Sequence, residues 1–335
     1  MTPRDLVELW QQIAGEPPGS TGLDRRLLDL DAPVSLYACV FWPSGRCGLL
    51  IEGDTAQRLA DGRIPRCRGV KLVHNVVSTS PPKTVVQIML EDARLRDIFA
   101  VLCADLVQVA RHERSASEAM RQCIDRLAMW QGLFERIPPQ GLSEEEQRGL
   151  FGELVVLQEI VLLALDALDA VTAWTGPEPR NQDFIHRGLA LEVKASLAKR
   201  HSRLTISNEK QLDERPHEQL FLAYVRLDES VSQGVTLPDM VERCRAQLEN
   251  DLAAARLFDD RLMAGGYLDI HAELYSQNSW KPDCPRLFRV AGDFPRLTEA
   301  NLPPGVGDIR YSIIADDLGS YEVDSGKVIS ELKGG

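Results

Sequence analysis

The stretch that decides the fold is DFIHRGLALEVK, residues 183–194, in which two largely apolar arms flank the pair Arg187-Gly188. A two-residue connection that contains Gly is typical of a tight β-hairpin, because Gly readily adopts the positive φ that such turns need. The turn would place Phe184 opposite Leu191. The stretch therefore predicts two short antiparallel strands joined at Arg187-Gly188.

The same register places two acids together. Asp183 would lie opposite Glu192, and directly opposed side chains have Cβ atoms about 4.5 to 5.5 Å apart, at which like charges repel unless a cation lies between them. Glu192 and Lys194 are two residues apart on one strand and so share a face, whereas Val193 points into the opposite layer. The sequence predicts a patch of two carboxylates and one amine, although a strand with Glu and Lys at this spacing also fits an ordinary solvated face.

The pattern Asp…(Asp/Glu)-X-Lys resembles the active site of the PD-(D/E)XK nuclease superfamily. The surrounding motifs GLFGE, WTGP…QDF, LEVKAS and ISNEKQL resemble one family within it, bacterial PD-(D/E)XK motif proteins associated with restriction and phage-defence gene clusters. The motif-level resemblance covers roughly residues 140 to 225. One position departs from the superfamily signature, since Gln182 and not Pro precedes the first acid.

The resemblance implies further site residues. In the resembled families, an acid on the first helix of the core joins the metal site, and Glu153 is the matching residue. A polar residue on a later helix, often Gln, approaches the site or the DNA backbone in these families, and Gln211 matches it. The cofactor expected is Mg²⁺, with Mn²⁺ as a substitute, because Mg²⁺ prefers carboxylates, carbonyl oxygens and waters. The expected ligands are Asp183, Glu192, the carbonyl of Val193, and Glu153. Lys194 would activate the attacking water or neutralise phosphate charge.

A locally basic segment follows the hairpin. The chain carries a net charge of -12, which argues against a protein that coats nucleic acid through clustered Lys and Arg. The residues expected to contact nucleic acid are Lys199, Arg200, Arg203 and Lys210. A DNA-binding segment whose long-range affinity comes from partner subunits fits this distribution, and so does a plain solvated loop.

Composition bounds the class of protein. The chain has 335 residues, of which 44% are hydrophobic and 26% charged, as in globular proteins of two domains or of one core with flanking modules. No run near the start has the pattern of a signal peptide, and acids interrupt the apolar stretch 154–168, so we expect a cytoplasmic protein with no membrane partner. The seven cysteines show no spacing suited to zinc.

Residues 1–138 are expected to form an N-terminal α+β recognition or assembly module. A short helix and a second short turn occupy residues 1–30, and four β-rich runs follow that predict an antiparallel meander. Two helices, about 91–113 and 115–136, complete the module, with Ser115 as a cap of the second. The four β-rich runs are residues 34–42, 45–53, 70–78 and 83–90.

Residues 139–265 are expected to form the PD-(D/E)XK core, in the order α-β-β-β-α-β. Ser143 and Glu146 predict a capping box for a helix that runs to about residue 167. A third strand at 204–206 would lead into a helix capped by Ser207 or Asn208, and a strand buried on both faces at 220–227 would be covered by helices at 239–252 and to 263. Residues 266–335 are expected to be a β-rich segment with strand-like runs at 267–274, 286–290 and 309–315.

The sequence thus predicts an α/β chain, α+β overall, with a restriction-endonuclease-like core whose central mixed sheet is flanked by helices. The function expected is that of a Mg²⁺-dependent DNA endonuclease, a subunit of a bacterial restriction or anti-phage defence system. Its partners would be DNA, proteins from a defence gene cluster and a second copy of the chain. The alternative is a catalytically silent subunit of such a complex that binds DNA or acts as a scaffold. A Ser/His hydrolase is disfavoured, because the chain has no G-x-S-x-G motif, and a P-loop is absent too.

Overall fold

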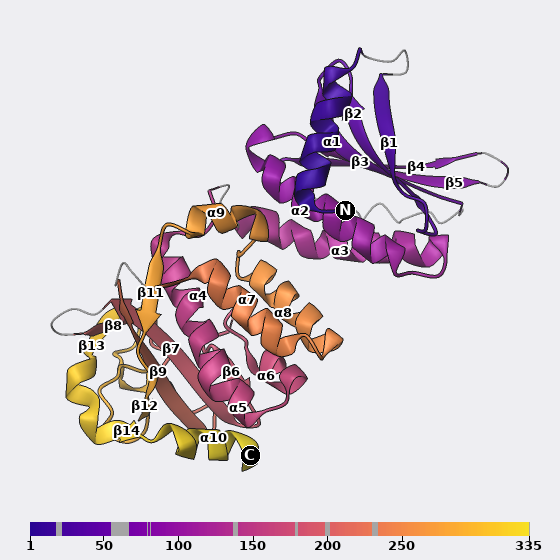
Figure 1. Cartoon of the computed structure of the whole chain (residues 1–335). Helices are drawn as coiled ribbons and strands as arrows, with labels where there is room; N and C mark the ends of the chain where they lie inside the picture. The colour runs from indigo at the N-terminus through magenta and orange to yellow at the C-terminus, as the bar shows by residue number, and fades with distance from the viewer. Residues whose placement is uncertain are drawn as a thin grey trace. The chain divides into compact units, whose positions relative to one another are not determined.

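The chain folds into two compact units, Met1–Gly141 and Leu142–Gly335, in a computed structural model (Figure 1). The structure describes residues 1–17, 22–54, 67–78, 80, 82–136, 140–177, 180–197, 202–229 and 234–334.

Unit 1 contains a five-stranded antiparallel sheet in the order β1-β2-β3-β5-β4. The strands are β1 (Leu23–Asp29), β2 (Ser35–Phe41), β3 (Arg46–Gly53), β4 (Val70–Val77) and β5 (Lys83–Leu90). The four expected strands are present, but the expected meander is wrong in its order, because β3 pairs with β5 and not with β4. The expected turn before residue 30 is also wrong: β1 is a largely exposed edge strand, so its sequence lacks the apolar alternation that marks a strand.

Three helices pack against this sheet, with α2 between the other two. They are α1 (Pro3–Gly15), α2 (Arg96–Arg111), which follows the 3₁₀ turn η1 (Ala93–Leu95), and α3 (Ala116–Arg136). The expected cap of α3 is confirmed, since Oγ of Ser115 accepts a hydrogen bond of 3.2 Å from the amide of Glu118. Such a cap satisfies one of the amides that the first helical turn leaves without a partner.

Unit 2 contains the helices that cover its larger sheet. The helices are α4 (Glu144–Val156), continued by a π-helical turn η2 (Leu157–Val161) and α5 (Leu162–Ala164), then α6 (Ala167–Ala173), α7 (Leu237–Leu248), α8 (Leu252–Ala264), α9 (Ala272–Tyr275) and α10 (Ser325–Gly334); short 3₁₀ turns are η3 (Asp269–His271), η4 (Glu299–Asn301) and η5 (Ala315–Tyr321). The capping box at the start of α4 is confirmed: the Ser143 hydroxyl accepts from the amide of Glu146, whose carboxylate accepts from the amide of Ser143 at 2.8 Å.

The sheet of unit 2 is mixed and is built around β9. The strands are β6 (Phe184–His186), β7 (Leu189–Leu197), β8 (Arg203–Ile206), β9 (Gln219–Asp228), β10 (Val235–Thr236), β11 (Ser279–Pro282), β12 (Arg286–Arg289), β13 (Tyr311–Ile314) and β14 (Glu322–Val323). On one side of β9, β7 is parallel, and β6 pairs with β7; on the other side, β11 and β12 are antiparallel. Because β9 is central, it is buried along most of its length, as its continuous apolar run predicts.

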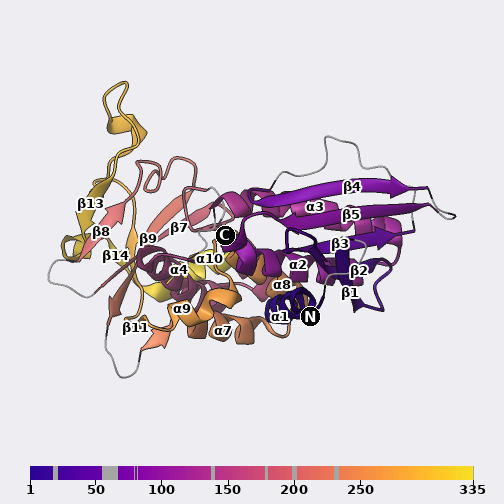
Figure 2. The ribbon, with the colours of Figure 1, turned by 90° about the horizontal axis from the view of Figure 1, so that it is seen from above.

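The sheet of unit 2 is covered on both faces. One face packs on α4, which contacts both β7 and β9, and this face carries residues such as Val193 and Ala223 (Figures 1 and 2). The opposite face carries Ala190 and Leu222, and it packs on the separate pair of strands β8 and β13. Glu192 and Lys194 alternate with Val193 along β7, so they belong to the face turned toward β8.

Two expectations about secondary structure in unit 2 are wrong. Residues 207–218 form turns and not a helix. The Asn208 side chain accepts from the amide of Lys210 at 2.9 Å, as a helical cap would, but hydrogen bonds from Gln182 and Arg296 to carbonyls of this segment hold it in turns. The strand expected at 267–274 is absent: residues 269–275 are helical, and Tyr267, His271 and Tyr275 are buried at a spacing of four.

Candidate active site

The predicted hairpin is present, with its turn at Arg187-Gly188. Both turn residues have positive φ, 43° for Arg187 and 85° for Gly188, as a tight primed turn requires. The expected pairing of Phe184 with Leu191 is confirmed. Strand β6 begins at Phe184, so Asp183 lies just before the strand.

The shortness of β6 determines what Asp183 contacts. The amide of Asp183 still donates to the carbonyl of Leu191 at 3.0 Å, which holds residue 183 beside β7. If β6 were longer, a backbone carbonyl of β6 would accept from the amide of Val193. Oδ2 of Asp183 accepts this hydrogen bond in its place, at 2.7 Å. The aspartate is thereby fixed at the edge of β7, next to Glu192.

Glu192 is buried beside Lys194. Only 1% of the Glu192 side chain is exposed, and Nζ of Lys194 lies 2.7 Å from its Oε1. No donor other than Lys194 reaches either oxygen of Glu192 among the described residues. Burial of a carboxyl group with so few donors is costly.

Gln211 reaches Lys194 from the turn segment 207–218. Its Oε1 accepts hydrogen bonds from Nζ of Lys194 at 3.2 Å and from the amide of Ser207 at 2.8 Å. The expected approach of Gln211 to the site is therefore present in the geometry, although the helix expected to carry it is not. The amine of Lys194 is held between a carboxylate and a carboxamide oxygen.

Glu153 joins the other acids from α4. Nε1 of the buried Trp174 donates to Oε2 of Glu153 at 2.7 Å. Gly176 lies between Glu153 and Asp183: a Cβ there would be 3.0 Å from Cδ of Glu153 and 3.1 Å from Oδ1 of Asp183. Only a residue without a side chain leaves both carboxylates where they are.

Close packing of α4 on β7 brings Glu153 to the sheet. A Cβ on Gly152 would lie 2.7 Å from Cβ of Ala195, so the helix approaches the strand at this glycine. Gly149, one turn earlier on α4, plays no such part, because no atom lies within 4 Å of a Cβ built there. The approach therefore depends on Gly152 alone of the two.

Burial and mutual repulsion shift the pKa values of the acids upward. Burial, followed by the charge of Asp183, raises the pKa of Glu192 to about 8, against the opposing effect of Lys194. The same two causes raise the pKa of Glu153 well above its usual range, and burial raises that of Asp183. For Lys194, burial lowers the pKa, but the charges of Glu192 and Asp183 outweigh it and leave the pKa above its usual value.

These groups line one cavity of about 650 Å³. The predicted site residues on its wall are Glu153, Asp183, Glu192, Val193, Lys194, Arg203 and Gln211. Arg148, five residues before Glu153 on α4, also lines it. Of the other residues expected to contact nucleic acid, Lys210 lines a second cavity of about 380 Å³ with Arg215, and Lys199 and Arg200 lie outside the described residues.

The model of the family described as "Putative PD-(D/E)XK family member, (DUF4420)" matches residues 6–316. The chain belongs to this PD-(D/E)XK family. No curated protein and no solved structure matches the chain. Membership indicates a nuclease, and nucleases of the PD-(D/E)XK type generally use divalent metal ions. Among the described residues, no helix has the length and apolar character needed to cross a membrane.

The donor set of this PD-(D/E)XK site fits a hard divalent cation. Carboxylate and carbonyl oxygens are the ligands that Mg²⁺ prefers, and among the described residues the oxygens of Glu192 have no donor other than Lys194. Within the described ranges, however, no three His, Cys, Asp or Glu side chains converge as the ligands of one ion do. The ligand set Asp183, Glu192, Val193 and Glu153 thus remains a prediction.

Three residues of the site have contacts that sequence analysis did not assign. Trp174 holds Glu153, Gly176 leaves room for the acids, and Gln182 contacts the segment that carries Gln211. All three lie in the family motif WTGP…QDF. The motif places these residues near the site, but sequence spacing does not predict a side-chain hydrogen bond across 21 residues, such as that from Trp174 to Glu153.

Proposed function

We propose that the chain is a Mg²⁺-dependent DNA endonuclease and a subunit of a bacterial restriction or anti-phage defence system. The observation that carries this proposal is the convergence of Glu153, Asp183, Glu192 and Lys194 on one cavity, with Lys194 as the one cation in contact with the buried Glu192 carboxylate. In a protein stabilised only by packing, such a cluster of buried acids would lower the free energy of unfolding. In a phosphodiesterase it is the required set of oxygen ligands and a cation.

The chemistry assigns a task to each group. Bound Mg²⁺, with Mn²⁺ as a substitute, would lower the pKa of a bound water and neutralise phosphoryl charge. The carboxylates of Asp183, Glu192 and Glu153 with the carbonyl of Val193 would hold it. Lys194, whose amine Gln211 and Glu192 hold in place, would stay protonated and neutralise charge on the phosphoryl oxygens or orient the attacking water.

DNA would approach along the open cavity. Arg203 and Arg148 lie on its wall and are the cations available to phosphates there, and Lys210 would extend the contact beyond it. The net charge of -12 makes tight unaided binding to DNA unfavourable. We therefore expect DNA affinity to depend on protein partners or on a second copy of the chain; the defence role is supported by the family resemblance.

The test compares the unchanged chain with Glu192→Ala and Lys194→Ala on plasmid DNA, in Mg²⁺, in Mn²⁺ and in EDTA, alone and with the products of neighbouring genes. Glu229→Ala, at an exposed residue after β9, is the matched control. We expect cutting by the unchanged chain and the control only when metal is present. Cutting that survives both site substitutions would refute the assignment, and DNA binding without cutting in every condition would favour the scaffold.

A further inference from the structure

Gln182 connects two parts of the candidate site. Its side chain is 4% exposed, and its Nε2 donates to the carbonyl of Lys210 at 3.0 Å and to that of Gln211 at 3.2 Å. Its Oε1 lies 3.0 Å from Nε2 of His217, which therefore donates to it. One side chain thus holds both the middle and the end of the turn segment 207–218.

The backbone of Gln182 is fixed independently of its side chain. Its carbonyl accepts from Oγ1 of Thr175 at 2.9 Å, and the carbonyl of the next residue, Asp183, accepts from the amides of Thr175 and Gly176 at 2.7 and 2.9 Å. The tripeptide Trp174-Thr175-Gly176 is the segment that contacts Glu153. The Gln182 side chain therefore extends from a hydrogen-bonded backbone segment that positions Asp183 and lies beside the residues that contact Glu153.

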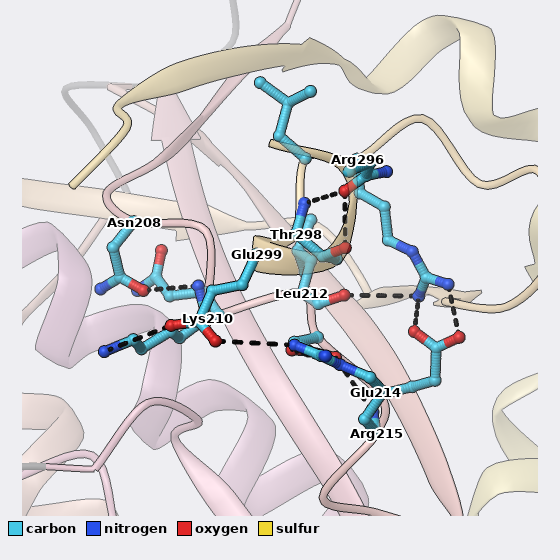
Figure 3. A network of polar contacts seen from close by, with 12 residues as sticks. Asn208, Lys210, Leu212, Glu214, Arg215, Arg296, Thr298 and Glu299 are labelled. Atoms are coloured by element: carbon cyan, nitrogen blue, oxygen red, sulfur yellow. Dashed lines mark hydrogen bonds and ion pairs between the residues drawn. The ribbon is translucent and has the colours of Figure 1, made fainter. Parts of the chain in front are cut away.

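The turn segment 207–218 is also held on its other side, where Figure 3 shows the contacts of Arg296 and Glu299. Nη1 of Arg296 donates to the carbonyl of Leu212 at 3.3 Å, and its guanidinium pairs with Glu214. Glu299 lies 3.7 Å from Nζ of Lys210 and from a guanidinium nitrogen of Arg215. Loss of the Gln182 side chain would leave these contacts in place, so the segment would shift without unfolding.

We propose that Gln182 is a positioning residue for Lys194 and acts through Gln211. By holding the carbonyl of Gln211, it sets the distance between the Gln211 side chain and the amine of Lys194. The inference rests on the proposed nuclease function, and it assigns a task to the one position at which the chain departs from the superfamily signature. A proline at 182 would have no side chain able to donate these bonds.

The experiment compares Gln182→Met, which keeps the length of the side chain without polar atoms, with Gln182→Glu, which keeps an acceptor for His217 but cannot donate to the two carbonyls. We expect both to lower kcat about tenfold with KM for plasmid DNA within about twofold, because small displacements of a reacting group lower the rate of chemistry and leave substrate binding intact. His217→Ala keeps both donated bonds, and its kcat should fall less than about threefold.

Amide hydrogen exchange gives a second measurement that needs no activity. In Gln182→Met, exchange of residues 207–211 should accelerate at least about threefold, while that of β9 stays unchanged. Equal kcat of Gln182→Met and the unchanged chain would overturn the inference alone, as would a parallel rise in KM or unchanged exchange at 207–211. An unchanged chain that cuts nothing in any condition would refute the proposed function, and the positioning role with it.

Discussion

Glu192 should make the metal-free protein less stable as the pH rises. Its pKa is about 8 in the folded chain against an ordinary value of 4.5, because burial and Asp183 both disfavour its charge. Between these two values the folded chain retains a proton that the unfolded chain has lost, so the free energy of unfolding falls with increasing pH across this window. Below about pH 4.5 both states are protonated and the effect is absent.

The size of the effect follows from the shift. One pKa unit corresponds to about 1.4 kcal/mol, and the two pKa values predict that Glu192 alone removes roughly 2 kcal/mol of stability between about pH 6 and about pH 8. For a unit of this size, 1 kcal/mol changes Tm by about 2–4 °C. The Tm of Glu192→Gln, which keeps the shape of the side chain but cannot ionise, should therefore fall by roughly 4–8 °C less than that of the unchanged chain over this interval.

Thermal unfolding in EDTA, followed by circular dichroism, measures the difference. Every other ionisable group is common to both proteins, so subtracting one curve of Tm against pH from the other gives the contribution of residue 192 together with its coupling to Glu153, Asp183 and Lys194. Glu229→Gln, an exposed position, should follow the unchanged chain. Parallel curves for Glu192→Gln and the unchanged chain, or a less stable Glu192→Gln at pH 8, would show that the electrostatic description of the site is wrong.

Three further substitutions test the packing around the acids. Gly176→Ala should lower kcat about 100-fold, because its methyl group would displace both carboxylates, whereas Gly319→Ala, where no atom lies within 4 Å, should cut normally; equal rates would refute the steric argument. Gly152→Ala should lower the free energy of unfolding by about 1–3 kcal/mol in urea titrations, and an unchanged midpoint would show that α4 can retreat from β7. Trp174→Phe keeps the ring but not the donor to Glu153, so it should weaken Mg²⁺ binding in calorimetry without losing the folded structure; unchanged affinity would exclude a ligand role for this acid.

The sequence predicted those parts of the fold that local signals specify. The Arg187-Gly188 turn fixed the register of the hairpin, because a two-residue connection allows only one pairing of its arms. Ser143 and Glu146 located the start of α4 by a reciprocal pair of hydrogen bonds that needs only four residues. Convergence of the acids on one cavity follows from the register and from the family motifs.

What the sequence did not predict depends on contacts between distant segments. The apolar pattern within each strand is the same whether β3 pairs with β4, as in a meander, or with β5, as observed. The choice depends on which strand packs better beside β3. The helix expected after β8 is replaced by turns whose geometry is held by Gln182 and Arg296, at 28 and 84 residues' separation. Local propensity favoured a helical cap at Asn208, and tertiary hydrogen bonds outweighed it.

A comparison within the chain shows why the cluster points to function and not to stability. In unit 1, Asp105 is also partly buried, and it accepts from Nε of Arg126 at 2.6 Å, from its Nη2 at 3.1 Å and from Nε1 of Trp130 at 2.7 Å. That acid has the donors that a structural carboxylate needs. The Trp donor recurs at Glu153, but Glu192 has only Lys194 as a partner among the described residues, and the charge of Asp183 also acts on Lys194.

Three carboxyl groups at one cavity share a single ammonium group, and burial, with repulsion between acids at Glu153 and Glu192, raises their pKa values. Ala190 and Leu222 on the same face are apolar, whereas Glu192 places a buried acid there. In the proposed function, a bound partner offsets the cost of this buried acid. A divalent cation has the charge and the preference for oxygen ligands to be that partner.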